Sequence, residues 1–163
     1  MPMAVSSSSA AIIWLLLFNP GIGLVNFVLG RSTGWLSSPF WGFIAVAVVD
    51  IWLRGCMNFI FIIAGLQNIP RELSESASID GANYFQRLKN VILPCLSPTL
   101  FFVLVINVVS SFQAFGEINI MTQGGPAGAT NVLVYSIYRD AFFNNKFAAA
   151  SAESIILFVI ILV

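Results

Sequence analysis

Apolar residues in this chain gather in four long runs that are separated by polar segments. The runs cover residues of about 3–18, 40–66, 96–115 and 147–163. An α-helix needs roughly 20 mostly apolar residues to cross a bilayer, and these runs approach or exceed that length. The pattern predicts an all-α fold, a polytopic bundle of transmembrane helices, with connecting loops at 19–39, 67–92 and 116–146.

The composition supports lipid as the solvent of this chain. Of its 163 residues, 58% are hydrophobic and 9% are charged, and the mean hydropathy is +0.92. Soluble domains carry about 25% charged residues, and a core of this size cannot hide so much apolar surface. These values exclude a soluble globular domain, a disordered chain and a basic nucleic-acid binder. We expect the bilayer as a partner and no nucleic acid.

Residues that could carry catalysis are scarce. The chain has no histidine, and its two cysteines, Cys56 and Cys95, are far apart without a metal-binding or disulfide pattern. We therefore predict no catalytic residues and no metal site, and we expect both cysteines to be packing residues. The chain also lacks the GxxxxGK[ST] loop that binds nucleotide phosphates. It is therefore not expected to be an enzyme or to hold a cofactor.

The two ends of the chain suggest part of a longer protein. No basic leader precedes the first apolar run, and the last run is still apolar at Val163. We expect an internal piece of a larger polytopic membrane protein. The alternative is a complete membrane protein of four helices.

The loop at 67–92 is the most charged part of the chain, and its pattern predicts two short helices. Pro70 and Glu72 suit the first turn of a helix, and Asp80-Gly81 is typical of a turn. A second helix is predicted from an apolar stripe at helical spacing, after which prolines are expected to break the pattern. The stripe comprises Tyr84, Phe85, Leu88, Val91 and Ile92, and the prolines are Pro94 and Pro98. This helix–turn–helix is predicted to lie at the membrane surface, where it could also be an ordinary amphipathic connector.

The same loop resembles a known sequence motif. Glu75-Ser76-Ala77, Asp80-Gly81-Ala82 and Ile92-Leu93-Pro94 are similar in order and spacing to the EAA motif of ABC importer permeases. The likeness extends along the chain, through Leu17-Phe18-Asn19-Pro20 to Thr122-Gln123-Gly124-Gly125-Pro126. It is greatest for the carbohydrate and sn-glycerol-3-phosphate (maltose-type) branch. Two departures are Ser76, where the motif has alanine, and Gly116, where an aspartate is common.

The resemblance implies a partial transmembrane domain of a type I ABC importer, multi-pass in a bacterial plasma (inner) membrane. It implies pairing with a second permease subunit, a dimer of ATP-binding cassette ATPases that holds the ATP, and an extracytoplasmic solute-binding protein. Lys and Arg are equally numerous on both sides, so only the resemblance puts loop 67–92 in the cytoplasm and loops 19–39 and 116–146 outside. The residues that would couple to the ATPase are Glu75, Ala77, Asp80, Gly81, Ala82 and Pro94.

Polar residues within the apolar runs are candidates for a solute pathway. Asp50 and Arg54 lie four residues apart on one helix face, and we favour a structural ion pair over a functional role for them. Trp52 and Asn58 match the family and are expected to face the pathway. Asn107, Ser111 and Gln113 could bind sugar hydroxyls, or could equally hold helices together.

Three functions fit these observations. The first is a permease subunit of an ATP-driven importer that moves a sugar or a glycerol-phosphate-like solute. The second is a fragment of a secondary transporter or channel that is not coupled to ATP, for which Asp50 and Arg54 are the only hint. The third is a membrane assembly protein that transports nothing.

Overall fold

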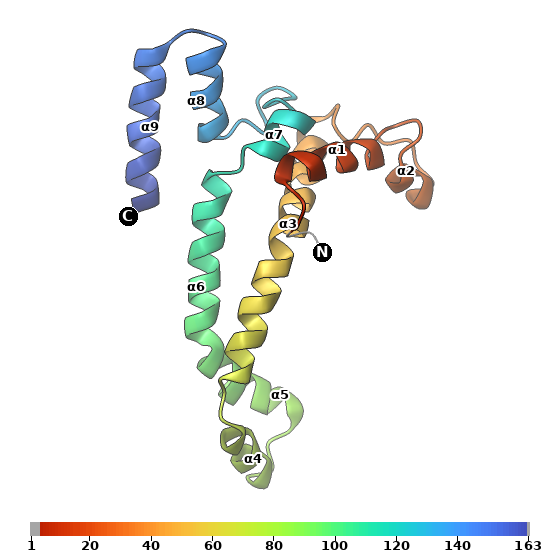
Figure 1. Ribbon diagram of the computed structural model, residues 1–163. Helices are drawn as coiled ribbons and strands as arrows, with labels where there is room; N and C mark the ends of the chain where they lie inside the picture. Colours follow the sequence, from red (N-terminus) through yellow and green to blue (C-terminus); the bar gives the residue numbers. More distant parts are fainter. Residues whose placement is uncertain (1–3, 163) are drawn as a thin grey trace. The chain divides into compact units, whose positions relative to one another are not determined.

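The computed structural model describes residues 4–162, and every regular element within that range is a helix (Figure 1). Two compact units divide the chain: unit 1 comprises the residues up to Arg54 and those from Val109 onward, and unit 2 comprises Gly55–Val108. The elements are α1 (Ser7–Leu17), α2 (Leu24–Leu29), α3 (Pro39–Gln67), α4 (Arg71–Ile79), α5 (Tyr84–Arg87), a π-helical segment (Leu88–Ile92), α6 (Leu93–Phe112), α7 (Gly116–Met121), α8 (Leu133–Phe142) and α9 (Phe147–Leu162).

Within residues 4–162, two helical stretches are long and apolar enough to cross a membrane. They are α3 and the continuous run from Tyr84 to Phe112, each of 29 residues. At a rise of 1.5 Å per residue each measures roughly 43 Å, more than the hydrocarbon thickness of about 30 Å. Only 6% and 11% of their most apolar windows are buried. Such exposure is unlike the core helix of a soluble protein and fits side chains that face lipid or another subunit.

The apolar helices nearest the two ends are shorter. α1 has 11 residues, and it begins at Ser7 rather than near residue 3 because the Ser6 side chain accepts a hydrogen bond from the Ser9 amide and caps the helix. α9 has 16 residues, starting at Phe147 as expected from the apolar pattern. Met3 and Val163, which the predicted runs included, lie outside the described residues.

The prolines do not break the helix that leads into α6, contrary to the sequence prediction. A π-helical segment precedes Pro94, in which the Leu93 amide donates to the Leu88 carbonyl. Pro98 has no amide hydrogen for the Pro94 carbonyl, and the Ser97 hydroxyl donates to that carbonyl instead, at 2.8 Å. Each proline leaves a preceding backbone carbonyl without its usual amide donor. Because neighbouring groups donate to these carbonyls instead, the helix continues through both positions.

Helices also occupy much of the segment predicted as the polar loop 116–146. α7 and α8 lie there, and the predicted helix 96–115 ends earlier, at Phe112. Tyr135 of α8 is buried in a cluster with Val46, Ala114 and Ile118, so an apolar face stabilises α8 despite its polar residues. Gly116 begins α7 beside α1, where an added Cβ would clash with the Ser7 hydroxyl. Gly116, which departs from the aspartate common in the family at this position, therefore leaves room for the Ser7 hydroxyl.

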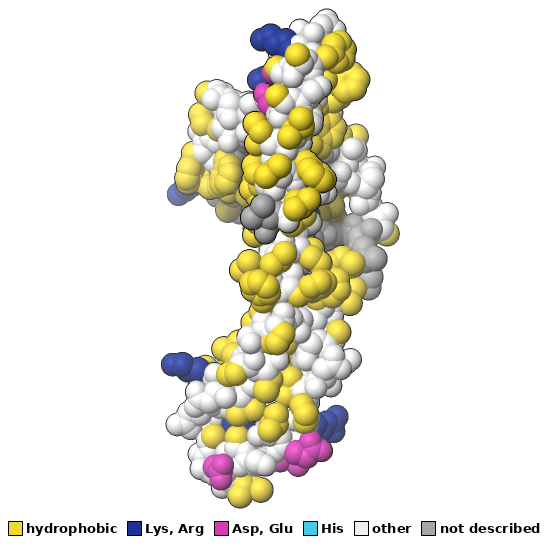
Figure 2. All heavy atoms as spheres, turned by 90° about the vertical axis from the view of Figure 1, so that its left-hand side faces the viewer, with side chains coloured by type: hydrophobic (Ala, Val, Ile, Leu, Met, Phe, Trp, Pro, Cys, Tyr) yellow, Lys and Arg dark blue, Asp and Glu magenta, His cyan; other side chains and the backbone are white. Residues whose placement is uncertain are grey.

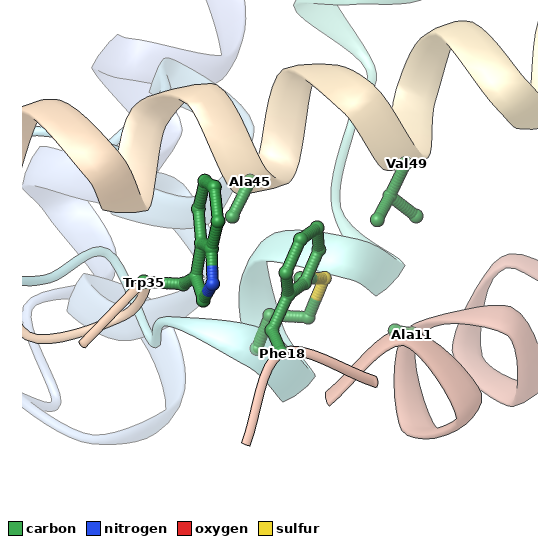
Figure 3. Packing of buried hydrophobic residues seen from close by; sticks show 6 residues of the cluster. Ala11, Phe18, Trp35, Ala45 and Val49 are labelled. Carbon is green, nitrogen blue, oxygen red and sulfur yellow. The ribbon is translucent and has the colours of Figure 1, made fainter. Parts of the chain in front are cut away.

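The core of unit 1 forms where α1, α3 and α7 meet. Figure 3 shows the Trp35 and Phe18 rings against the face of α3 that carries Ala45 and Val49. Small residues on α1 and α3 let the rings approach, with ring centroids 5.4 Å apart. The loop before α3 is held by Asn26, whose buried amide donates to two carbonyls and accepts from the Thr33 amide and the Trp35 indole. All its hydrogen-bonding capacity is used inside the protein.

Candidate functional site: the helix–turn–helix and the membrane polar cluster

Four of the six predicted coupling residues, Ala77, Asp80, Gly81 and Ala82, lie at the C-terminal end of α4 in unit 2. The Ala82 amide donates to the Ala77 carbonyl and the Gly81 amide to the Ser78 carbonyl, at 3.0 and 3.1 Å. These two bonds define a Schellman motif, which requires a left-handed residue after the helix. Gly81 supplies it with φ of +81°. The spacing from Ala77 to Ala82 therefore has a local structural cause, which is to end α4 and turn the chain.

α5 starts directly after this turn because the side chains of its first residues cap its N-terminus. Asn83 accepts a hydrogen bond from the Gln86 amide, and the Gln86 side chain accepts one from the Asn83 amide. This reciprocal arrangement is a capping box, which fixes where a helix begins. With a Schellman motif before it and a capping box after it, the turn Gly81–Asn83 is defined by local hydrogen bonds alone.

The helix–turn–helix exposes large apolar side chains next to charged ones. Leu73, Tyr84, Phe85 and Ile79 are between 45% and 87% exposed, with Ile79 the most exposed. Figure 2 shows blue and magenta side chains gathered around yellow ones at this end of unit 2. Glu75, Asp80 and Pro94 are exposed, whereas Ala77 and Ala82 are half-buried. An apolar surface rimmed by charges is typical of a protein interface.

Two of the predicted pathway residues bind one another in unit 2. Asn58 Nδ2 donates to Asn107 Oδ1 at 3.1 Å, and Asn107 Nδ2 donates to Asn58 Oδ1 at 2.8 Å. The Asn107 amide also donates to the Val103 carbonyl. Nearby, an added Cβ at Gly65 would lie 2.7 Å from the Thr99 hydroxyl, so α3 and α6 pack closely there. Small residues and paired amides are the usual means of helix association in membranes.

We expect a double-mutant cycle on Asn58 and Asn107 to reveal this pairing. Asn58→Ala and Asn107→Ala should each lower the thermal midpoint of the full-length protein in detergent. Their coupling energy should be about 1 kcal/mol, because either change removes both reciprocal bonds. The Ser97→Ala variant, whose hydroxyl bonds only within its own helix, should show no coupling to Asn58→Ala. Additive effects of Asn58→Ala and Asn107→Ala would contradict the pairing.

Asp50 and Arg54 form an ion pair in unit 1. The guanidinium Nε lies 2.7 Å from Asp50 Oδ1, and Nη2 donates to the Ser110 carbonyl at 3.0 Å. Both side chains are about one quarter exposed. Arg54 therefore neutralises Asp50 and also ties α3 to the last turn of α6.

A third charged residue, Glu117 of α7, completes the cluster and was missed by the sequence reasoning. Its side chain is hydrogen-bonded to Asp50, and the residue is only 3% exposed. Burial raises the pKa of the Glu117 carboxyl, and the neighbouring Asp50 raises it further, while a backbone hydrogen bond and Arg54 oppose the rise. The protonated carboxyl is the form that can donate to Asp50. Glu117 lies in a segment predicted as a polar loop, so only its packing reveals the contact.

A cavity of about 510 Å³ adjoins this cluster within unit 1. Asp50 lines it, together with Ser111 and an apolar wall that includes Phe43, Phe112 and Ile118. Thr130 and Asn131, from the segment before α8, add polar groups. Volumes of 300–1,000 Å³ with few polar groups are typical of small-molecule sites. Trp52 instead packs edge-on against Trp14, and Gln113 is exposed just after α6.

Comparisons with known proteins assign the chain to a family. Residues 1–163 match the sequence profile of the family described as "Binding-protein-dependent transport system inner membrane component". Proteins called "sn-glycerol-3-phosphate transport system permease protein UgpA" are 41% identical in Agrobacterium fabrum and 39% in Yersinia enterocolitica. These alignments cover 99% of this chain and 57% and 56% of the relatives. The chain thus spans little more than half the length of the relatives it matches.

A solved structure agrees with the sequence match. It is the crystal structure of a bacterial ABC transporter involved in the import of the acidic polysaccharide alginate. The TM-score is 0.87 at 26% identity, over 99% of this chain and 58% of that one.

The all-helical fold, the long exposed apolar helices and these matches define an inner-membrane protein of a transport system. The chain belongs to the family of inner membrane components of binding-protein-dependent transport systems.

Proposed function

We propose that this chain is the greater part of a permease subunit in an ATP-driven importer of a sugar or a related small solute. The observation that carries the proposal is the helix–turn–helix of α4 and α5, closed by local hydrogen bonds and exposing Leu73, Ile79, Tyr84 and Phe85. A rigid element with an apolar face is suited to pass on the movement of a partner. Family membership supports the same function.

In this proposal the helix–turn–helix lies in the cytoplasm and docks onto an ABC ATPase, which alone binds and hydrolyses ATP. Glu75 and Asp80 are exposed and available to basic residues of the partner. Gly81 and Ala82 shape the turn, and Ala77 accepts the bond that closes it. Pro94 stands at the entry to the following long helix.

The remaining assembly follows from the same family. A second permease subunit pairs with this one in a bacterial inner membrane, which the chain crosses several times. Segments 19–39 and 116–146 face an external solute-binding protein. Along the solute path, the cavity beside Asp50 and Ser111 is the site that we assign to the solute. Asn58 and Asn107 instead hold α3 and α6 together.

The two other functions are less well supported. Secondary carriers bind ions at broken helices in the membrane, whereas α3 is one unbroken helix and Arg54 is already paired with Asp50. A protein that only assembles complexes has no use for the cavity at Asp50.

Ile79 provides the test of the coupling face. We expect the full-length permease to capture its ATPase and to support ATP-dependent uptake in proteoliposomes with its binding protein. Ile79→Asp should reduce capture about tenfold or more, because it places a charge in an apolar contact. Ile22→Asp is the matched control, since Ile22 is similarly exposed, at 81% against 87%, but lies in unit 1. Solute uptake by the purified permease without any ATPase would overturn the proposed function.

A further inference from the structure

The charged cluster of unit 1 bears on which solutes the cavity accepts. Asp50 is the one charged residue among the described residues that line the cavity. Arg54 is held behind it by two contacts, to the Asp50 carboxylate and to the Ser110 carbonyl. Glu117 lies against Asp50 from α7, almost fully buried. The cluster therefore contains two carboxyl groups and one guanidinium, and a carboxylate is the group that faces the solute.

Anionic solutes are recognised by donors that carry positive charge and remain available. Arginine binds phosphate or carboxylate by offering parallel N–H groups to it. Arg54 binds Asp50 through Nε and a backbone carbonyl through Nη2, and it is not among the described residues that line the cavity, so Asp50 is the charged group that a phosphate there would meet. An anion in the cavity would therefore lie beside the Asp50 carboxylate. Like charges in a partly buried site repel one another strongly.

Cationic solutes gain little as well, because Arg54 already neutralises Asp50. Hydroxyl groups do not meet this obstacle. A carboxylate has about four acceptor positions, so Asp50 can accept from a solute hydroxyl while it keeps Arg54. The apolar wall with Phe43 and Phe112 suits the apolar face of a sugar ring.

We infer that Asp50, Arg54 and Glu117 form a charge filter that admits uncharged, hydroxyl-rich solutes and disfavours phosphate esters and sugar acids. This inference rests on the proposed permease function and on the cavity as its solute site. It separates the chain from the relatives named for sn-glycerol 3-phosphate and from the structural neighbour named for an acidic polysaccharide, although the fold is shared.

Matched pairs of neutral and anionic solutes test the filter. The full-length permease, with its partner subunit and ATPase in nanodiscs, is dialysed without the binding protein against maltose or maltobionate, and against glycerol or sn-glycerol 3-phosphate. We expect the neutral member of a pair to bind at least about tenfold more tightly than its anionic counterpart. Equal or tighter binding of the anion would overturn the filter, and so would a failure of all four solutes to bind at millimolar concentration.

Variants then locate the cause of the selectivity. Asp50→Asn keeps the shape of the side chain but removes the carboxylate that lines the cavity and neutralises Arg54, so the anion-to-neutral binding ratio should rise about tenfold. Adding Arg54→Gln to Asp50→Asn should remove most of that rise. Asp140→Asn is the matched control, because it makes the same change at a carboxylate of unit 1 that is not among the residues lining the cavity, and the ratio should stay near the wild-type value. An anion-to-neutral binding ratio that stays unchanged in Asp50→Asn would contradict the assignment of the selectivity to Asp50.

ATP-dependent uptake of a neutral solute separates the two proposals. If uptake requires ATP while anions bind as well as neutral solutes, the permease function stands and the filter fails. If neutral solutes bind but ATP drives no uptake of any solute, the permease function fails.

Discussion

The Gly81→Leu variant of the full-length permease should lose transport because the turn between α4 and α5 will no longer form. Gly81 has φ of +81°, and a side chain with a Cβ costs about 1–2 kcal/mol in that conformation. No atom lies within 4 Å of an added Cβ, so strain rather than crowding inside the chain is the cause. Losing the bond from Ala82 to Ala77 would unwind the cap and displace the apolar face.

We expect Gly81→Leu to lower ATPase capture and ATP-driven uptake about tenfold or more, a factor that corresponds to about 1.4 kcal/mol. Gly81→Asn should retain much of both, because asparagine tolerates the left-handed conformation better than other side chains. For ATPase capture, Gly128→Leu is the matched control, since Gly128 has φ of +76° with equally open surroundings but lies in unit 1. Wild-type capture together with normal uptake in Gly81→Leu would show that the turn does not couple the two proteins.

Removal of Arg54 should have the largest effect on stability. In Arg54→Leu, Asp50 loses its cationic partner and is left beside the Glu117 carboxyl without a neutralising charge. Breaking a buried ion pair by removing one partner costs about 3–5 kcal/mol, and we expect about 2–4 kcal/mol here because both side chains are about one quarter exposed. The loss of the bond to the Ser110 carbonyl also frees the end of α6.

The measurement is the thermal midpoint and the folded yield of the full-length protein in detergent. Arg54→Leu should lower both strongly, whereas Asp50→Asn/Arg54→Gln should recover most of the loss, because neither charge is then left unpaired. Arg31→Leu is the control for the loss of an exposed arginine in the same unit and should change little. If the double variant is no more stable than Arg54→Leu, the ion pair is not what holds this region.

Elements that depend on local contacts were predictable from the sequence, whereas contacts between distant residues were not. α2 (Leu24–Leu29) lies in the segment 19–39 that was predicted as a loop, but the residues of α3 and the turn at Asp80-Gly81 were readable from an apolar run and from turn chemistry. Hydrogen bonds within a few residues produce such elements, so the signal lies in one stretch of chain. The predicted break at the two prolines was wrong because the Ser97 hydroxyl and the π-helical segment use the backbone groups that proline leaves unpaired.

The residues proposed for the solute path were harder to predict. Asn58 and Asn107 are 49 positions apart, and their mutual bonds are a property of helix packing. Glu117 lies in a segment that the sequence predicts as a polar loop, and its contact with Asp50 depends on the packing of α7. Tyr135 and Tyr138 recur at helical spacing within 133–142, and that signal could have revealed α8.

The sequence by itself determined the solvent, the helical class and the helix–turn–helix, because hydropathy, length and capping residues act over short distances. Only the tertiary structure decided the partners of the scarce polar groups. It joined Asn58 to Asn107, Arg54 to Asp50 and the Ser110 carbonyl, and Glu117 to Asp50. In an apolar surrounding a polar group must find a partner wherever the fold brings one near, and that choice is not written in the neighbouring residues.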